Sequence, residues 1–190
     1  MTGRAPTAVK IIIAGGFGVG KTTLVGAISE ITPLTTEAIL TAAGVGTDDP
    51  TLVPDKHSTT VAMDFGRITL DADLVLYLFG TPGQQRFWFM WDELCRGAIG
   101  AVVLADTRRL ADSFSAIDFF EDRRLPYIVG VNQFQGAAVY DLEDVRQALA
   151  IQRGIPIVAC DVRARASAKN VLVTVTEHAL AMRAGSMARR

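Results

Sequence analysis

The residues with the clearest chemical potential form a glycine-rich turn that ends in Gly20, Lys21 and Thr22. With Gly15 they fit the pattern G-x-x-x-x-G-K-[ST], directly after the β-branched run Ile11–Ile13. Glycines let the backbone turn tightly and aim successive N–H groups at an anion, and a following helix adds its positive end. The lysine can reach the β- and γ-phosphates, and the threonine hydroxyl can bind Mg²⁺. The spacing therefore predicts a nucleotide phosphate-binding loop rather than an ordinary glycine turn.

Most of this loop is expected to contact the bound nucleotide. The predicted binding residues are Gly15, Phe17, Gly18, Val19, Gly20, Lys21, Thr22 and Thr23. Lys21 is also a predicted catalytic residue, because its charge would stabilise the phosphate that is transferred.

The elements that must position the loop follow from the apolar pattern along the chain. Strand and helix periodicities alternate, which predicts an α/β fold with crossover helices. The expected strands are 11–13, 61–70, 74–79, 99–105, 127–131 and 155–159, and the expected helices are 22–31, 87–97, 112–124, 142–151 and 169–183. This is a six-stranded, mostly parallel sheet with five helices and one antiparallel edge strand, because 61–70 and 74–79 are close enough for a hairpin. We expect a single domain over residues 1–190, with disordered tails at 1–7 and 184–190.

The segment 32–60 is expected to be one long connection, and its place after a phosphate loop favours a functional role. A formal net charge of −1 gives no general attraction to nucleic acid or anionic lipid. Cys95 and Cys160 lack metal-binding spacing, which indicates reduced thiols. The chain shows no apolar secretion core and no run long enough to cross a bilayer, so a cytoplasmic protein without direct membrane insertion is expected.

A second loop, Gly80–Arg86 (GTPGQQR), ends the predicted hairpin. It resembles the Asp-x-x-Gly-Gln motif of Ras-like small GTPases, whose glycine N–H contacts the γ-phosphate and whose glutamine orients the attacking water. The resemblance assigns these roles to Gly83 and Gln84. Arg86 is a candidate for an internal arginine finger, although a solvated surface arginine is the alternative.

The other loops at this edge of the predicted sheet match the same family. The resemblance implies that Thr59 or Thr60 is the switch threonine that meets Mg²⁺ in the triphosphate state. The segment around Asn132, Gln133 and Gln135 takes the place of the Asn-Lys-x-Asp motif that reads the base. Ala159, Cys160 and Asp161 resemble the short segment whose backbone touches the guanine oxygen.

Three stretches resemble a more specific family within the Ras-like GTPases: TTVAMDFG, FGTPGQQRFWFMW and GAVVLADTR. They look like the conservon-type GTP-binding proteins of actinomycetes, which are bacterial Ras-like small GTPases related to the gliding-motility GTPases. The resemblance implies a P-loop NTPase fold, GTP/GDP and Mg²⁺ as cofactors, and a molecular switch in bacterial signalling. It also implies a roadblock-domain regulator and a membrane sensor kinase as partners, which would bring the protein to the membrane.

Two departures from the family pattern bear on catalysis. Gly80 replaces the aspartate that normally holds Mg²⁺ through water, and the nearest replacement is Asp64, which hairpin geometry could bring to the ion. A solvated strand residue is the alternative for Asp64. Phe17 replaces a small glycine, and its ring should hinder closure of the glutamine, so slow GTP hydrolysis is expected.

The base-reading motif also departs from the pattern. Gln135 replaces an aspartate that makes a charge-assisted bidentate contact with guanine, and Gln133 replaces a lysine that packs over the base. A neutral amide discriminates less between guanine and adenine. Guanine is favoured by the whole-chain resemblance. The alternatives are an interaction module with lost hydrolysis or relaxed base specificity, and a P-loop kinase of small molecules.

Aromatic residues follow the second loop directly: Phe87, Trp88, Phe89 and Trp91. Consecutive aromatics on a helix cannot all face one side. The pattern therefore favours a nucleotide-gated surface for protein partners, with core packing as the alternative.

Overall fold

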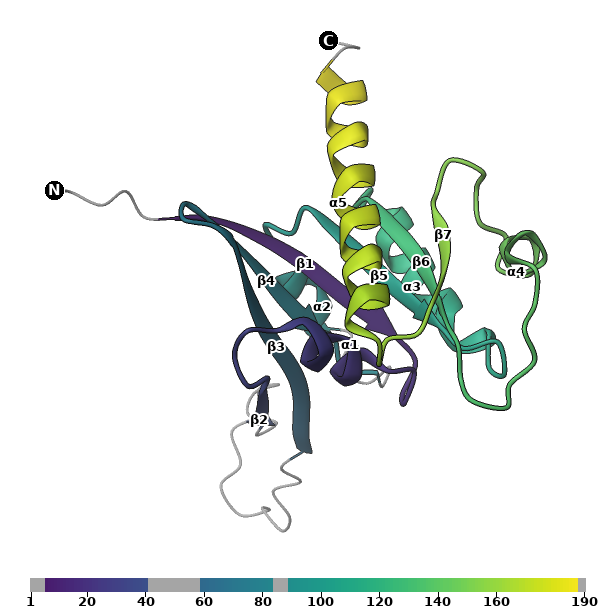
Figure 1. Ribbon diagram of the computed structural model, residues 1–190, viewed down its shortest axis with the longest axis horizontal. Helices are drawn as coiled ribbons and strands as arrows, with labels where there is room; N and C mark the ends of the chain where they lie inside the picture. The colour runs from purple at the N-terminus through teal and green to yellow at the C-terminus, as the bar shows by residue number, and fades with distance from the viewer. Residues whose placement is uncertain (1–5, 41–58, 84–88, 188–190) are drawn as a thin grey trace, which may run out of the picture.

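The sheet of the computed structural model contains every expected strand and one more (Figure 1). The structure describes residues 6–40, 59–83 and 89–187. Within these residues the order of the seven-stranded sheet is β2-β3-β4-β1-β5-β6-β7. The strands are β1 (Thr7–Gly15), β2 (Leu34–Leu40), β3 (Thr59–Asp71), β4 (Leu74–Gly80), β5 (Gly100–Ala105), β6 (Tyr127–Asn132) and β7 (Ile157–Cys160). β1 pairs in parallel with β4 and β5, and β6 and β7 continue in parallel, which confirms the predicted α/β class.

The antiparallel part of the sheet is wider than the sequence predicts. β3 runs antiparallel to β4, as the hairpin requires, and β2 then pairs antiparallel to β3. β2 lies inside segment 32–60, so the prediction of one long connection is wrong for residues 34–40. Its sequence, LTTEAIL, contains β-branched Thr and Ile, which suit a strand, but its high threonine content resembles a loop. Residues 41–58 lie outside the described part of the chain.

The five expected helices are present and cover both faces of the sheet. They are α1 (Lys21–Ile28), α2 (Trp91–Cys95), α3 (Ala111–Asp122), α4 (Leu142–Ala148) and α5 (Arg165–Met187). Ile11 and Ile13 belong to the core cluster under α1 and α5, whereas Ile12 belongs to the cluster that contains Phe120 of α3 and Val145 of α4. Because side chains alternate along a strand, a strand buried on both faces reads as the unbroken apolar run seen in the sequence.

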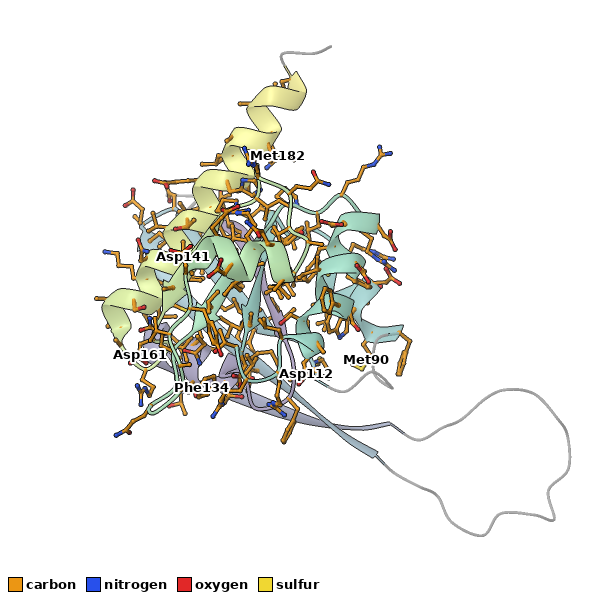
Figure 2. The ribbon with its side chains drawn as sticks, turned by 90° about the vertical axis from the view of Figure 1, so that its right-hand side faces the viewer. Met90, Asp112, Phe134, Asp141, Asp161 and Met182 are labelled. Carbon is orange, nitrogen blue, oxygen red and sulfur yellow. The ribbon has the colours of Figure 1, made fainter. Side chains whose placement is uncertain are left out.

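Two predicted tails are shorter than the sequence indicates. β1 already begins at Thr7, whose N–H donates to Asp73 O at 2.7 Å. α5 continues to Met187 through Ala, Leu, Met and Arg residues, which favour helix. Its last turns project beyond the sheet (Figures 1 and 2). No helix in the described ranges is long and apolar enough to cross a membrane.

The parallel strands end at the same edge of the sheet. β1, β4, β5, β6 and β7 deliver the loops after Gly15, Gly80, Ala105, Asn132 and Cys160 to this edge. Open α/β sheets bind ligands there, beyond the carboxyl ends of their strands.

Candidate nucleotide-binding site

The phosphate-binding loop has a conformation that only glycine permits at two key positions. Gly15 ends β1 with φ +136°, and a Cβ there would lie 2.4 Å from the Leu104 carbonyl oxygen. Gly20 has φ +107°, and a Cβ there would lie 2.9 Å from Asn132 Nδ2. Both dihedrals belong to the region that L side chains rarely adopt. The loop is therefore held tightly between β1, β5 and β6, and α1 begins at the next residue, Lys21.

Lys21 is folded back onto the loop that precedes it. Its Nζ donates to the carbonyl oxygens of Gly15 at 2.9 Å and Gly16 at 2.8 Å. Burial lowers the pKa of the ammonium to about 8, and the nearby carboxylate of Asp64 opposes that shift. A lysine ammonium has three donors, so one N–H remains for a phosphate oxygen.

The carboxylate beside Thr22 comes from β3. Thr22 Oγ1 donates to Asp64 Oδ2 at 2.7 Å, and Asp64 is only 7% exposed. Asp64 is the register partner of Gly80 at the end of β4. A Cβ at Gly80 would lie 2.9 Å from Asp64 Oδ2 and 3.0 Å from Asp64 Cβ. The absence of a side chain at position 80 therefore makes room for the carboxylate at position 64.

Thr22 and Asp64 present the oxygen ligands that Mg²⁺ prefers. Within the described ranges no group of three or more His, Cys, Asp and Glu side chains could hold a metal alone. Mg²⁺ usually takes one or two protein ligands and completes its shell with water and phosphate oxygens.

The two candidate switch threonines are not brought to this pair. Thr59 and Thr60 lie in β3, where their register partners are Leu40 and Ile39 of β2. Thr60 is four residues from Asp64 along an extended strand, a separation of about 13 Å. In this conformation the pairing with β2 holds both threonines away from Thr22 and Asp64.

Gly83 lies directly against the phosphate-binding loop. A Cβ on Gly83 would lie 2.9 Å from Lys21 Nζ and 3.0 Å from the backbone nitrogen of Phe17. The predicted γ-phosphate sensor therefore touches the groups that are expected to hold the phosphates. The predicted catalytic residues Gln84 and Arg86 lie outside the described part of the chain, as do Phe87 and Trp88.

Phe17 exposes 71% of its surface, and its backbone is fixed by the segment just before α3. Its carbonyl oxygen accepts a hydrogen bond from Arg109 Nη2 at 2.7 Å. Gly16 lies close to α3 itself, because a Cβ there would lie 2.7 Å from Asp112 Cβ. The sequence does not reveal this contact between Arg109 and Phe17, because the acceptor is a backbone carbonyl, which no side-chain pattern marks.

Asn132 ties three loops together. Its Nδ2 donates to Val19 O at 3.0 Å, and its Oδ1 accepts from the Val162 N–H at 3.2 Å. The side chain is buried, so it joins the phosphate loop to the segment after β7. Gln133 and Gln135 have exposed side chains at the mouth of the site, and the Gln133 N–H donates to Cys160 O at 2.7 Å.

The predicted base-reading loop is also held by the segment that follows β5. Asp106 is 3% exposed and accepts from Arg108 Nε at 2.9 Å and Nη2 at 2.7 Å. These hydrogen bonds lower the pKa of Asp106. The Arg108 guanidinium lies 3.9 Å from the centre of the Phe134 ring, between Gln133 and Gln135. No motif in the sequence marks this connection, because it depends on how Arg108 folds back onto Asp106.

The segment after β7 offers backbone groups rather than reactive side chains. Ala159 is exposed, whereas Cys160 is buried, which raises the pKa of its thiol to about 12. The Asp161 carboxylate accepts from Arg163 Nε and Nη2, both at 2.8 Å, which lowers its pKa to about 2. Cys160 therefore stays protonated, and the Asp161 carboxylate is paired with Arg163.

The aromatic cluster after Gly83 is divided between core and surface. Trp91 is 2% exposed and packs on Phe119 and Phe120, with ring centres 5.1 Å and 6.0 Å away. Phe89 is 66% exposed. In this structure Trp91 is a core residue, which corrects its assignment to a partner surface, while Phe89 remains available for one.

Two comparisons at the level of sequence found similar proteins. A family model described as conserved hypothetical ATP binding protein matches residues 13–182. An uncharacterized protein of Methanocaldococcus jannaschii is 29% identical over 127 residues, which make up 66% of this chain and 70% of that protein.

Similar solved structures include G domains and a cytosolic domain of FeoB iron transporters. The T. maritima G domain has a TM-score of 0.62 at 18% identity, over 91% of this chain and 99% of that one. The FeoB G-domain from Methanococcus jannaschii has a TM-score of 0.59 at 12% identity, over 91% and 98%. The T. maritima FeoB cytosolic domain in a GDP form has a TM-score of 0.64 at 18% identity and matches 93% of this chain, which spans only 65% of that longer chain. These likenesses show a P-loop G-domain fold.

Proposed function

The chain belongs to the family of conserved hypothetical ATP binding proteins, and we propose that it is a magnesium-dependent molecular switch that binds guanine nucleotides and hydrolyses GTP slowly. The position of Gly83 carries this proposal. Gly83 lies against Lys21 Nζ and the Phe17 backbone nitrogen, which are the groups expected to hold phosphate oxygens. A γ-phosphate at these groups would have to displace Gly83. From its new position the Gly83 N–H would contact the γ-phosphate, and a loop that is held by the third phosphate and released on hydrolysis is how nucleotide switches change their surface.

Thr22 and Asp64 would hold Mg²⁺, which neutralises charge on the transferred phosphate when it is bound. Lys21 would stabilise the same charge with its remaining N–H, and Gln84 would orient the attacking water, with Arg86 as a candidate second cation. Phe17 supports a slow rate. Its carbonyl is fixed by Arg109, and its ring is exposed at the mouth of the loop, where it would obstruct closure of Gln84.

Base preference is proposed from the whole-chain resemblance to Ras-like GTPases. A specific observation favours a second candidate, relaxed or adenine specificity: the family description names ATP, and the exposed Gln135 is a neutral amide. Titration with GTP, GDP, ATP and ADP, each with and without Mg²⁺, tests both. We expect guanine nucleotides to bind more tightly and Gln135→Asp to increase that preference. Equal affinities for the two bases would exclude the guanine assignment.

Hydrolysis is tested separately by single-turnover release of phosphate from GTP. We expect slow release that requires Mg²⁺ and is lost in Gln84→Ala. An absence of release, with and without partner proteins, would favour a nucleotide-dependent interaction module that has lost hydrolysis.

We also propose that protein partners regulate the switch in the cytoplasm. By resemblance these are a roadblock-domain regulator and a membrane sensor kinase, which would link the protein to signal transduction. Binding of a purified roadblock-domain protein should depend on whether GDP or a GTP analogue is present, and it should weaken in Phe89→Ala.

A further inference from the structure

α5 has two apolar rows, and only one of them packs on the sheet. The buried row is Ala168, Val171, Leu172, Val175 and Ala179. The second row is Val173, Leu180 and Met187, which are 43%, 58% and 80% exposed. Positions seven residues apart lie on one line along a helix, as in the contact seam of a coiled coil. The exposed row therefore has the geometry of a surface that packs against another helix.

The exposed row begins beside a groove and ends on the projecting part of α5. The groove lies between the end of α1, β3, β4 and α5; its apolar lining includes Ile68, Leu70, Leu76 and Val173, and its charged lining is Glu30, Arg165, Lys169 and Glu177. From Ala179 to Met187 the only charged residue is Arg183. These last turns stand clear of the sheet (Figures 1 and 2). A helix end with so little charge is unusual on a water-exposed surface.

We propose that a second copy of this chain covers this surface, with the two α5 helices antiparallel about Leu180. A two-fold contact must be self-complementary, so each residue meets the one equally far on the other side of Leu180. Val173 then lies level with Met187 of the partner subunit, and Thr176 lies level with Ala184 of the partner subunit. Apolar residues meet apolar residues, and small residues meet small residues.

Charge complementarity selects the antiparallel arrangement. Glu177 lies three residues before Leu180 and Arg183 three residues after it, so Glu177 is level with Arg183 of the partner subunit. A parallel pair would instead bring Glu177 level with Glu177 of the partner subunit. Neither residue takes part in an ion pair within the described part of the chain. The two-fold arrangement therefore supplies both exposed charges with opposite partners.

The groove gives the end of the partner helix a place to pack. Met187 of the partner subunit would lie at Val173, beside the exposed Leu70 on β3. This contact lies along α5, away from the loops that follow β1, β4 and β6 and form the candidate nucleotide site. Association of two copies is therefore compatible with nucleotide binding.

Charge reversal tests the proposal in the full-length protein. Molar mass is measured by light scattering and sedimentation over a wide range of protein concentration. Wild type should form a dimer, and Glu177→Arg or Arg183→Glu should each raise the dimer dissociation constant about tenfold, because each turns two attractive pairs into two repulsive ones. The double variant should regain wild-type association, and Arg153→Glu, an exposed charge away from α5, should have no effect.

Cross-linking gives an independent result. Leu180→Cys should form a disulfide-linked dimer under mild oxidation, since the two-fold places position 180 opposite itself. Met182→Cys, on another side of the helix, should cross-link far less, and wild type controls for Cys95. A wild type that stays monomeric at all concentrations would overturn the proposal, as would a dimer that is insensitive to both single reversals.

Discussion

Asp64 brings a carboxylate to Thr22 from β3, at the position that pairs with Gly80 of β4. We expect Asp64→Ala to lower the affinity for Mg²⁺ in the nucleotide complex about 10- to 100-fold, as for other residues that support a metal. Nucleotide binding should then depend less on Mg²⁺. Gly80→Asp alone should destabilise the fold by about 1–3 kcal/mol, because its Cβ would lie 2.9 Å from Asp64 Oδ2. The double variant should recover much of the Mg²⁺ dependence, since it moves the carboxylate to β4.

Nucleotide affinity as a function of Mg²⁺ concentration measures this exchange. Asp73→Ala, an exposed carboxylate at the other end of the hairpin, is the matched control and should behave as wild type. A double variant as insensitive to Mg²⁺ as Asp64→Ala would show that Asp64 has a different role.

Lys21 makes nucleotide binding depend on pH. Burial lowers its pKa to about 8 in the free protein, while a bound phosphate favours the charged ammonium. Above pH 8 binding must therefore take up a proton, and the apparent Kd should be about tenfold weaker at pH 9 than at pH 7. Lys21→Arg stays charged and should lose this dependence. A wild-type affinity that is flat with pH would contradict the role given to Lys21.

The lowered pKa of Lys21 also makes the stability of the free protein depend on pH: stability rises with pH, whereas nucleotide affinity falls. Below pH 8 the free protein buries a charged ammonium, which opposes folding. Between pH 8 and the ordinary lysine pKa of 10.5 the unfolded chain binds more protons than the folded one, so this group favours folding more as the pH rises.

Some of these residue contacts follow from sequence, and others do not. Asp64 is predictable because a hairpin with a short turn brings it opposite Gly80, and the strand register confirms that pairing. Arg109 is not predictable, because it donates to the backbone carbonyl of Phe17 from a distant segment. The burial of Asp106 is equally hidden, since it depends on how Arg108 folds back onto it.

At the scale of elements, α2 and α3 share an aromatic core that leaves one ring outside. Trp91 is buried between Phe119 and Phe120, so Trp91→Ala should lower the free energy of unfolding by about 3–5 kcal/mol. Phe89 is exposed, and Phe89→Ala should change the free energy of unfolding by less than about 0.5 kcal/mol. Denaturant unfolding of both variants measures the difference. Equal effects would mean that both rings belong to the core.

The sequence predicts elements best where burial leaves an uninterrupted apolar run. β5 and β6 are buried along their whole length and are found where the pattern places them. β2 is missed because it lies at the edge of the sheet, where no second neighbour demands an apolar pattern. α5 is underestimated for a related reason: its last turns have no sheet beneath them, so core periodicity stops before the helix ends.

At the scale of the whole molecule, we expect the contact of Gly83 with the phosphate loop to determine the relative affinities for GDP and GTP. A ligand shifts a conformational equilibrium only by its difference in affinity for the two states. In the proposed switch GDP would bind with Gly83 in place and GTP would displace it, so wild type should bind GDP more tightly than a non-hydrolysable GTP analogue. In Gly83→Ala the new Cβ would lie 3.0 Å from the Phe17 backbone. It should therefore strain the closed state, in which residue 83 lies against the phosphate loop, and not a state in which residue 83 has moved away.

We expect Gly83→Ala to reduce the preference for GDP about tenfold, which corresponds to about 1.4 kcal/mol of strain in the closed state. Fluorescence titration with both nucleotides measures the ratio of the two dissociation constants. Gly154→Ala is the control, because a Cβ there meets nothing within 4 Å. An unchanged ratio in Gly83→Ala would mean that the triphosphate binds without moving Gly83, and the switch would then need another moving part.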